Sequence, residues 1–146
     1  MNLIAKLISA VFNPLVISPF TFYILIFNDH NPNNHLLFFI AIFFSSILPF
    51  SLILYFKKLG KISSLEAPIR EQRLELLVIS SLFNSIAFIL LKYFQASNIV
   101  QGLMFCYAIN TAITWLITRH WKISIHMIGI GGPFVALTLS GYNHLF

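Results

Sequence analysis

The sequence predicts an all-α fold, namely a polytopic membrane helical bundle of about five transmembrane helices. Of its 146 residues, 58% are hydrophobic and only 9% are charged, and the mean hydropathy is +0.86. Soluble domains carry about 25% charged residues, so a surface of this composition would not stay dispersed in water. The apolar residues fall in stretches near the roughly 20 residues that a helix needs to cross a bilayer. Helices are expected throughout, because backbone polar groups in hydrocarbon must be satisfied within their own segment.

The five expected spans cover residues 3–27, 36–56, 74–94, 100–118 and 123–141, within one integral membrane domain of residues 1–146. Pro14, Pro19 and Pro49 are expected to kink the first two spans, because each lacks an N–H and crowds the preceding turn. The last span is the least regular, since its GIGGP sequence (residues 129–133) can break it into a loop followed by a short helix.

Basic residues are distributed unevenly over the two sides of this arrangement. If the N-terminus is inside, that side holds all nine Lys and Arg residues except Lys92. Cytoplasmic loops carry such an excess, so we expect a multi-pass protein of the cell membrane with its N-terminus and basic loops in the cytoplasm. The alternative is that these residues bind phosphate, in which case function rather than topology explains their distribution.

Charge and cysteine usage limit the partners and cofactors. A formal net charge of +5 beside apolar spans fits contact with anionic lipid headgroups, so we expect membrane lipids as partners and no nucleic acid. Cys106 is the single cysteine, which excludes an intramolecular disulfide and a cysteine-based metal cluster. It is expected to be buried as a small apolar residue. No metal or other cofactor is expected.

Polar residues recur inside two of the expected spans. The fourth span carries Tyr107, Asn110, Thr111, Thr114 and Thr118 at helical spacing, and the third carries Ser80, Ser81, Asn84 and Ser85. These side chains either form hydrogen bonds between helices, at about 0.6 kcal/mol each, or line a wettable track toward a headgroup site. The first interpretation is favoured, because both spans also carry small-residue pairs suited to close helix packing.

A basic segment at residues 57–73 precedes the third span. Arg70 and Arg73 lie three residues apart on one helical face near the membrane surface, and guanidinium groups match phosphate oxygens bidentately. The alternative is a solvated basic anchor with Glu66, Glu71 and Glu75 as local partners. The segment by itself favours the anchor.

A second segment, TRHWKISIHMIGIGGP (residues 118–133), opens the last span. His126 falls just inside the apolar run, and an ionisable group at that depth is a functional candidate. Imidazole titrates near neutrality, so it could donate a proton to a leaving group, and the following glycines let backbone N–H groups approach an anion. An interfacial histidine with glycines for helix packing is an equal alternative. Trp115 and Trp121 are expected to anchor this region at the interface.

Together the two segments resemble the type 2 phosphatidic acid phosphatase superfamily. The REQR sequence (residues 70–73) opens one span, and KISIH (residues 122–126) followed by glycines opens another. The second motif is similar to that of a divergent microbial branch, Lys-Ile-Ser-x-His followed by glycines. The resemblance implies hydrolysis of isoprenoid or glycerolipid phosphates without a metal. It also implies His126 as the proton donor and a set of phosphate-binding residues, namely Lys61, Arg70, Arg73, Lys122 and Ser124.

The sequence also departs from the family pattern. Leu74 and Ile123 stand where prolines are expected, and Ile125 stands where a glycine is expected. The third motif, which supplies the nucleophilic histidine, and a sixth span have no counterpart, so we expect an incomplete phosphatase with weak or no activity. The alternative is a non-enzymatic structural or accessory membrane protein whose basic loops contact anionic lipids. A homo-oligomer or a completing partner chain is left open.

Overall fold

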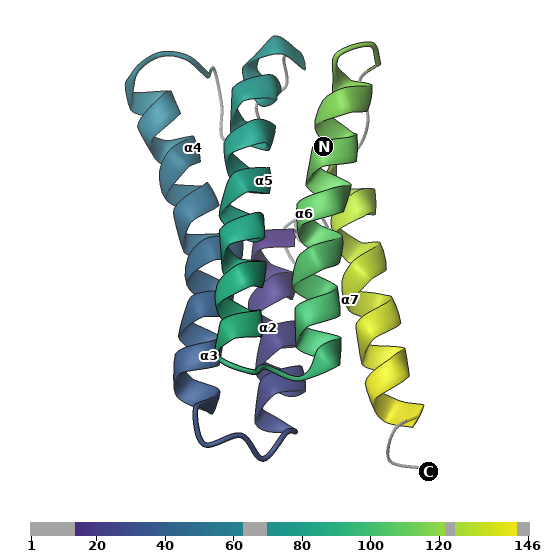
Figure 1. Ribbon diagram of the computed structural model, residues 1–146. Coiled ribbons are helices and arrows are strands. Elements are labelled where there is room, and N and C mark those ends of the chain that lie inside the picture. Colours follow the sequence, from purple (N-terminus) through teal and green to yellow (C-terminus); the bar gives the residue numbers. More distant parts are fainter. Residues whose placement is uncertain (1–13, 63–69, 122–124, 143–146) are drawn as a thin grey trace, which may run out of the picture.

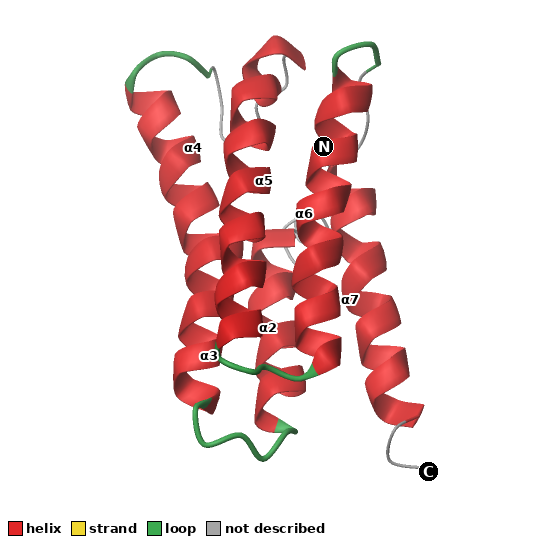
Figure 2. Cartoon of the chain, viewed as in Figure 1, coloured by secondary structure: helices red, strands yellow, loops and turns green. Residues whose placement is uncertain are grey.

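The computed structural model of the chain describes residues 14–62, 70–121 and 125–142. All regular elements in these ranges are helical, which confirms the all-α prediction (Figure 2). The elements are α2 (Pro14–Phe27), α3 (Asn34–Ile42), the π-helical η1 (Phe43–Ile47), α4 (Leu48–Lys58), α5 (Arg70–Tyr93), α6 (Asn98–Thr118) and α7 (Ile125–Tyr142).

The helices run alternately up and down in one bundle (Figure 1). A turn leads from α2 into α3, and α3, η1 and α4 follow one another without a break. The chain returns through α5, rises again through α6 and descends through α7. The most extensive packing joins α5 to α6, and α7 packs mainly against α6 and α2. At the lower end in Figure 1, Asn31 Nδ2 donates to the backbone oxygen of Gln95 at 3.1 Å and joins the two turns.

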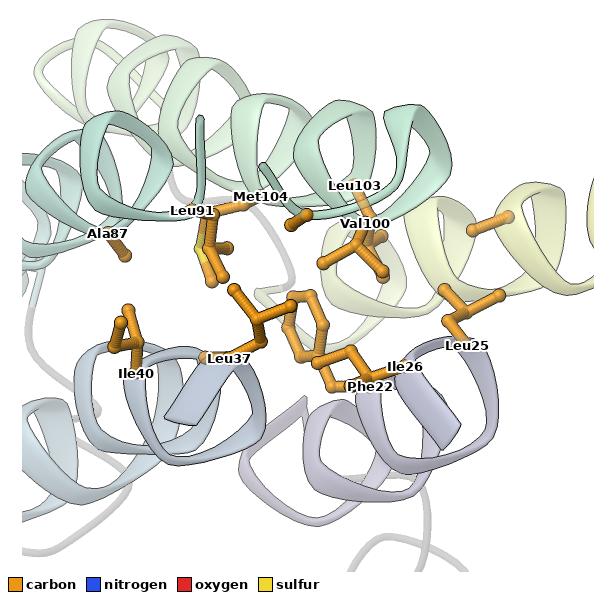
Figure 3. Packing of buried hydrophobic residues seen from close by; sticks show 13 residues of the cluster. Phe22, Leu25, Ile26, Leu37, Ile40, Ala87, Leu91, Val100, Leu103 and Met104 are labelled. Carbon is orange, nitrogen blue, oxygen red and sulfur yellow. The ribbon is translucent and has the colours of Figure 1, made fainter. Parts of the chain in front are cut away.

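The hydrophobic core lies where five helical segments face one another (Figure 3). Its largest fully buried side chains include Phe22, Leu37, Leu91 and Met104, which come from α2, α3, α5 and α6. Core positions on one helix are typically three or four residues apart, as Leu37 and Ile40 of α3 and Ala87 and Leu91 of α5 show, so that an apolar stripe faces inward. Large apolar side chains also cover the outer surface, for example Leu82 at 58% exposure.

An apolar outside and an apolar core together are typical of helices in lipid. Three helices among the described residues are long and apolar enough to cross a membrane: Asn34–Lys58, Glu71–Tyr93 and Asn98–Thr118. They correspond to the expected spans 36–56, 74–94 and 100–118. The apolar helix Val16–Phe27 is shorter and covers the described part of the expected span 3–27, of which residues 3–13 lie outside the described ranges.

The predicted break in the last span is wrong, because α7 continues through the GIGGP sequence as one helix. Pro133 lies inside the helix and lacks one intrahelical hydrogen bond, and its side chain is buried. Gly132 serves close packing instead of a turn. A Cβ at this position would lie 3.3 Å from the Leu103 Cδ1 atom of α6, closer than an ordinary van der Waals contact.

The irregularity expected at Pro49 takes the form of the π-helical turn η1. The Leu48 N–H donates to the Phe43 oxygen, five residues back instead of four. Pro49 has no N–H to offer the Ser45 carbonyl, and a wider turn lets the helix pass this position. The π-turn packs against α5 and α2 and brings the buried Ser46 into the bundle.

The predicted burial of Cys106 is also wrong, since this side chain is exposed on the outer face of α6. The buried stripe of α6 includes Met104 and Ala108. Cys106 lies two residues from each, which is about 200° around the helix, so it points away from the core.

The core assignment predicts different effects for the same substitution on two faces of α5. Leu91→Ala removes a fully buried side chain from the centre of the cluster and should lower the free energy of unfolding by about 2–5 kcal/mol. Leu82→Ala, on the exposed face, should change it by less than about 0.5 kcal/mol. Unfolding titrations in detergent micelles would measure both. Equal losses would contradict this packing.

Candidate functional site

Three helix ends that carry basic residues lie together at one end of the bundle, the upper end in Figure 1. They are the end of α4, the start of α5 and the end of α6. We call this region the basic end and define it by Lys57, Lys58, Lys61, Arg73 and Arg119. Among the described Lys and Arg residues, Lys92 alone lies toward the opposite end, in the last turn of α5.

A glycine-dependent turn ends α4 and positions Lys61. Gly60 adopts a left-handed φ of 72°, its N–H donates to the Lys57 oxygen at 3.1 Å, and the Lys61 N–H donates to the Phe56 oxygen at 3.0 Å. This pair of bonds is the Schellman arrangement, which satisfies carbonyl groups at a helix end. The same turn carries the Lys61 Nζ over the Phe56 ring, 4.7 Å from its centroid.

Lys61 forms an ion pair with a residue of the next helix, α5. Its Nζ donates to Glu75 Oε2 at 2.8 Å, which links the turn after α4 to α5. Beneath this pair, Phe56, Ile62 and Leu76 form a small buried cluster. Glu75 is one of the local partners that the anchor interpretation expected. A carboxylate at this distance offsets the charge of Lys61, so Lys61 contributes less to anion binding than its formal charge implies.

The arginines at this end differ in their surroundings. Arg73 lies in the first turn of α5 and is half-buried. Arg119 is exposed, and its guanidinium carbon lies 5.0 Å from the centroid of the Trp115 ring, within the range of a cation–π contact. The side chain of Arg70, the first residue of α5, lies outside the part of the chain that the structure describes.

The second predicted motif is described only in part. Lys122 and Ser124 lie outside the described ranges, and His126 is placed in the first turn of α7 without its side chain. The start of α7 lies in the same half of the bundle as the start of α5 (Figure 1). However, α5 and α7 are not main neighbours: each packs against α6, and the other main neighbour of α7 is α2. Convergence of Arg73 and His126 on one phosphate stays a prediction.

The polar residues inside the spans divide into two groups. Ser81 Oγ donates to the Ala108 oxygen of α6 at 3.1 Å, which confirms the interhelical interpretation for Ser81. Ser85, Thr111 and Thr114 instead donate to carbonyl oxygens one turn earlier in their own helices, at 2.6–2.8 Å. These local bonds satisfy the hydroxyl groups without joining helices.

One interhelical contact was missed by reasoning from the sequence. Ser18 Oγ of α2 lies 3.0 Å from Ser45 Oγ of η1. The sequence feature that could have indicated this contact is the position of Ser45 four residues before Pro49, where the helix loses a hydrogen-bond donor.

Within the described residues, no three His, Cys, Asp or Glu side chains gather closely enough to hold a metal ion.

Comparisons of the chain with protein-family models, curated proteins and solved structures find no match. The resemblance to lipid phosphatases therefore rests on the motif residues, and the basic end rests on the geometry of the bundle.

The ion pair at the basic end predicts a small, measurable coupling. Lys61→Ala, Glu75→Ala and the double variant form a thermodynamic cycle, and we expect a coupling free energy of about 0.2–1 kcal/mol because both side chains are partly exposed. Chemical unfolding in micelles at low and high salt would measure it, with the coupling decreasing at high salt. A coupling of zero at low salt would contradict the pair.

Proposed function

We propose that this chain is a multi-pass membrane protein whose basic end lies at the cytoplasmic membrane surface and binds phosphate groups of anionic lipids. The observation that carries this proposal is the one-sided gathering of cations by the fold. Five basic residues from three helix ends share the basic end, namely Lys57, Lys58, Lys61, Arg73 and Arg119.

The length of α5 supports a transmembrane placement. Glu75 and Lys92 bound its uncharged section, and at 1.5 Å per residue the rise between them is about 26 Å. This is close to the roughly 30 Å of hydrocarbon in a bilayer. Tyr55 and Trp121 are exposed toward the basic end, and Tyr93 is exposed at the other. Amphipathic rings at both levels are typical of the two membrane interfaces.

The accessible charges of the basic end suit an anionic lipid surface. Lys57 and Lys58 close α4 and are exposed, as is Arg119 after α6. Basic side chains near an anionic leaflet each contribute about 1 kcal/mol of attraction, and phosphate oxygens are good acceptors for both ammonium and guanidinium groups. Lys61 contributes less, because Glu75 already pairs with it.

A second candidate function is hydrolysis of isoprenoid or glycerolipid phosphates. The observation in its favour is that Arg73 and His126 occupy the first turns of α5 and α7, in the same half of the bundle. In this proposal His126 protonates the leaving group. The phosphate is held by Lys61, Arg70 and Arg73, with Lys122 and Ser124 assisting. The family's nucleophilic histidine has no counterpart in residues 1–146, so turnover by this chain is expected to be weak or absent.

Lipid binding should depend on the basic end and not on charge elsewhere. Replacing Lys57 and Lys58 together by Gln should weaken retention of phosphatidic acid roughly tenfold or more, since each charge contributes about 1 kcal/mol. Native mass spectrometry of the protein released from neutral detergent would count bound lipids. Lys92→Gln is the matched control at the opposite end and should leave retention unchanged. An equal loss in the control would contradict the proposal.

Phosphate release separates binding from hydrolysis. Purified chain incubated with a prenyl diphosphate should release phosphate at the background rate, while phosphatidic acid retention by His126→Ala stays at the wild-type level. Colorimetric phosphate detection would measure the rate. Release above background that is lost in both His126→Ala and Arg73→Ala would instead establish the second candidate.

A further inference from the structure

Polar side chains from four helical segments lie inside the apolar bundle, and three of them are buried. We call them the polar layer: Ser18 of α2, Ser45 and Ser46 of η1, Asn84 of α5 and Tyr107 of α6. Ser18, Ser46 and Asn84 are only 2%, 7% and 6% exposed. The Ser45 hydroxyl lies 3.0 Å from that of Ser18 and 3.4 Å from that of Ser46.

Tyr107 of α6 and Asn84 of α5 are the remaining two members. The Tyr107 hydroxyl lies beside that of Ser18, without a hydrogen bond of good geometry. The Ser81 bond to Ala108 sets the register of α5 against α6, and Asn84 follows Ser81 by about one turn. Asn84 lies about one turn before Ala87 on the buried face of α5. Ala87 faces Ile40 of α3 (Figure 3), and α5 packs against both α3 and η1.

Two atoms of the polar layer have unmet hydrogen-bonding capacity. Asn84 Oδ1 and the Tyr107 hydroxyl are both buried and have no hydrogen-bond partner among the described residues. An unpaired buried polar group costs about 1–3 kcal/mol, and an amide that is 6% exposed inside an apolar bundle has no bulk solvent to compensate it. Ser81 and Ser85, on the same stretch of α5, are by contrast hydrogen-bonded.

The chemistry of the polar layer defines what it can bind. Its members are neutral, so it offers no counter-charge to an ion. Asn84 Oδ1 needs a donor, and the Tyr107 hydroxyl both donates and accepts. A matching ligand is a small neutral molecule that also donates and accepts, and buried waters typically make about three hydrogen bonds to groups of this kind.

We propose that the polar layer is an internal water-binding site, in which water donates to Asn84 Oδ1 and bonds to the hydroxyl groups of Tyr107 and the Ser18–Ser45 pair. The buried Thr114 and Thr118 lie on α6 between Tyr107 and the basic end and continue the polar face. This site is independent of phosphate binding or hydrolysis at the basic end.

Nuclear magnetic resonance on the intact chain tests the site directly. The protein would be labelled with 15N-asparagine in micelles of dodecylphosphocholine, which has no hydroxyl group, so that water is the sole small hydroxylic ligand. We expect cross-peaks between water and the Asn84 side-chain amide protons, as for the exposed Asn98. An Asn84 amide without water cross-peaks, beside an Asn98 amide that shows them, would overturn the proposal.

A pair of variants gives a second readout whose sign is decisive. If water binds, Asn84→Leu displaces it, strands the Tyr107 hydroxyl and lowers the melting temperature by about 2–4 °C. If the layer is dry, the same change removes an orphaned amide and raises the melting temperature, which would contradict the proposal. Ser85→Ala is the control, because the Ser85 hydroxyl already donates to the Ser81 oxygen within its own helix at 2.8 Å.

Discussion

The constraint on which this structure depends is that an apolar chain must satisfy its backbone hydrogen bonds within each segment. That requirement makes the described apolar segments helical, and short connections then force neighbouring helices to run in opposite directions. Alternation brings the end of α4, the start of α5 and the end of α6 to one side of the bundle. The basic end is thus a consequence of backbone chemistry combined with where the sequence places its Lys and Arg residues.

The helices were predictable because their signal is local. Apolar length fixed the spans 36–56, 74–94 and 100–118 to within a few residues of the helices observed. The errors arose where the outcome depends on a neighbouring helix. The glycines before Pro133 were expected to break α7, yet one of them allows α6 to approach. Cys106 was expected to be buried but is exposed. The prediction failed because composition alone does not show which face of α6 meets the core.

The candidate site was predictable in part for the same reason. Charge counting grouped the described basic residues other than Lys92 at one end, as the structure does, since it needs only the order of the helices. It could not assign Lys61 to Glu75, because that pair depends on the left-handed turn at Gly60 and on how α4 meets α5. Nor could it find the contact between Ser18 and Ser45, whose 27-residue separation is closed only by tertiary packing.

The close approach at Gly132 has a mechanical consequence for the bundle. A methyl group at this position would lie 3.3 Å from the Leu103 Cδ1 atom, so the Leu103 side chain would have to shift by a few tenths of an ångström. Because α7 packs mainly against α6 and α2, this adjustment would fall on the side of the bundle that carries His126, away from the packing of α4 against α5. Glycine at position 132 therefore lets α7, the helix that carries His126, lie against α6 without displacing the Leu103 side chain.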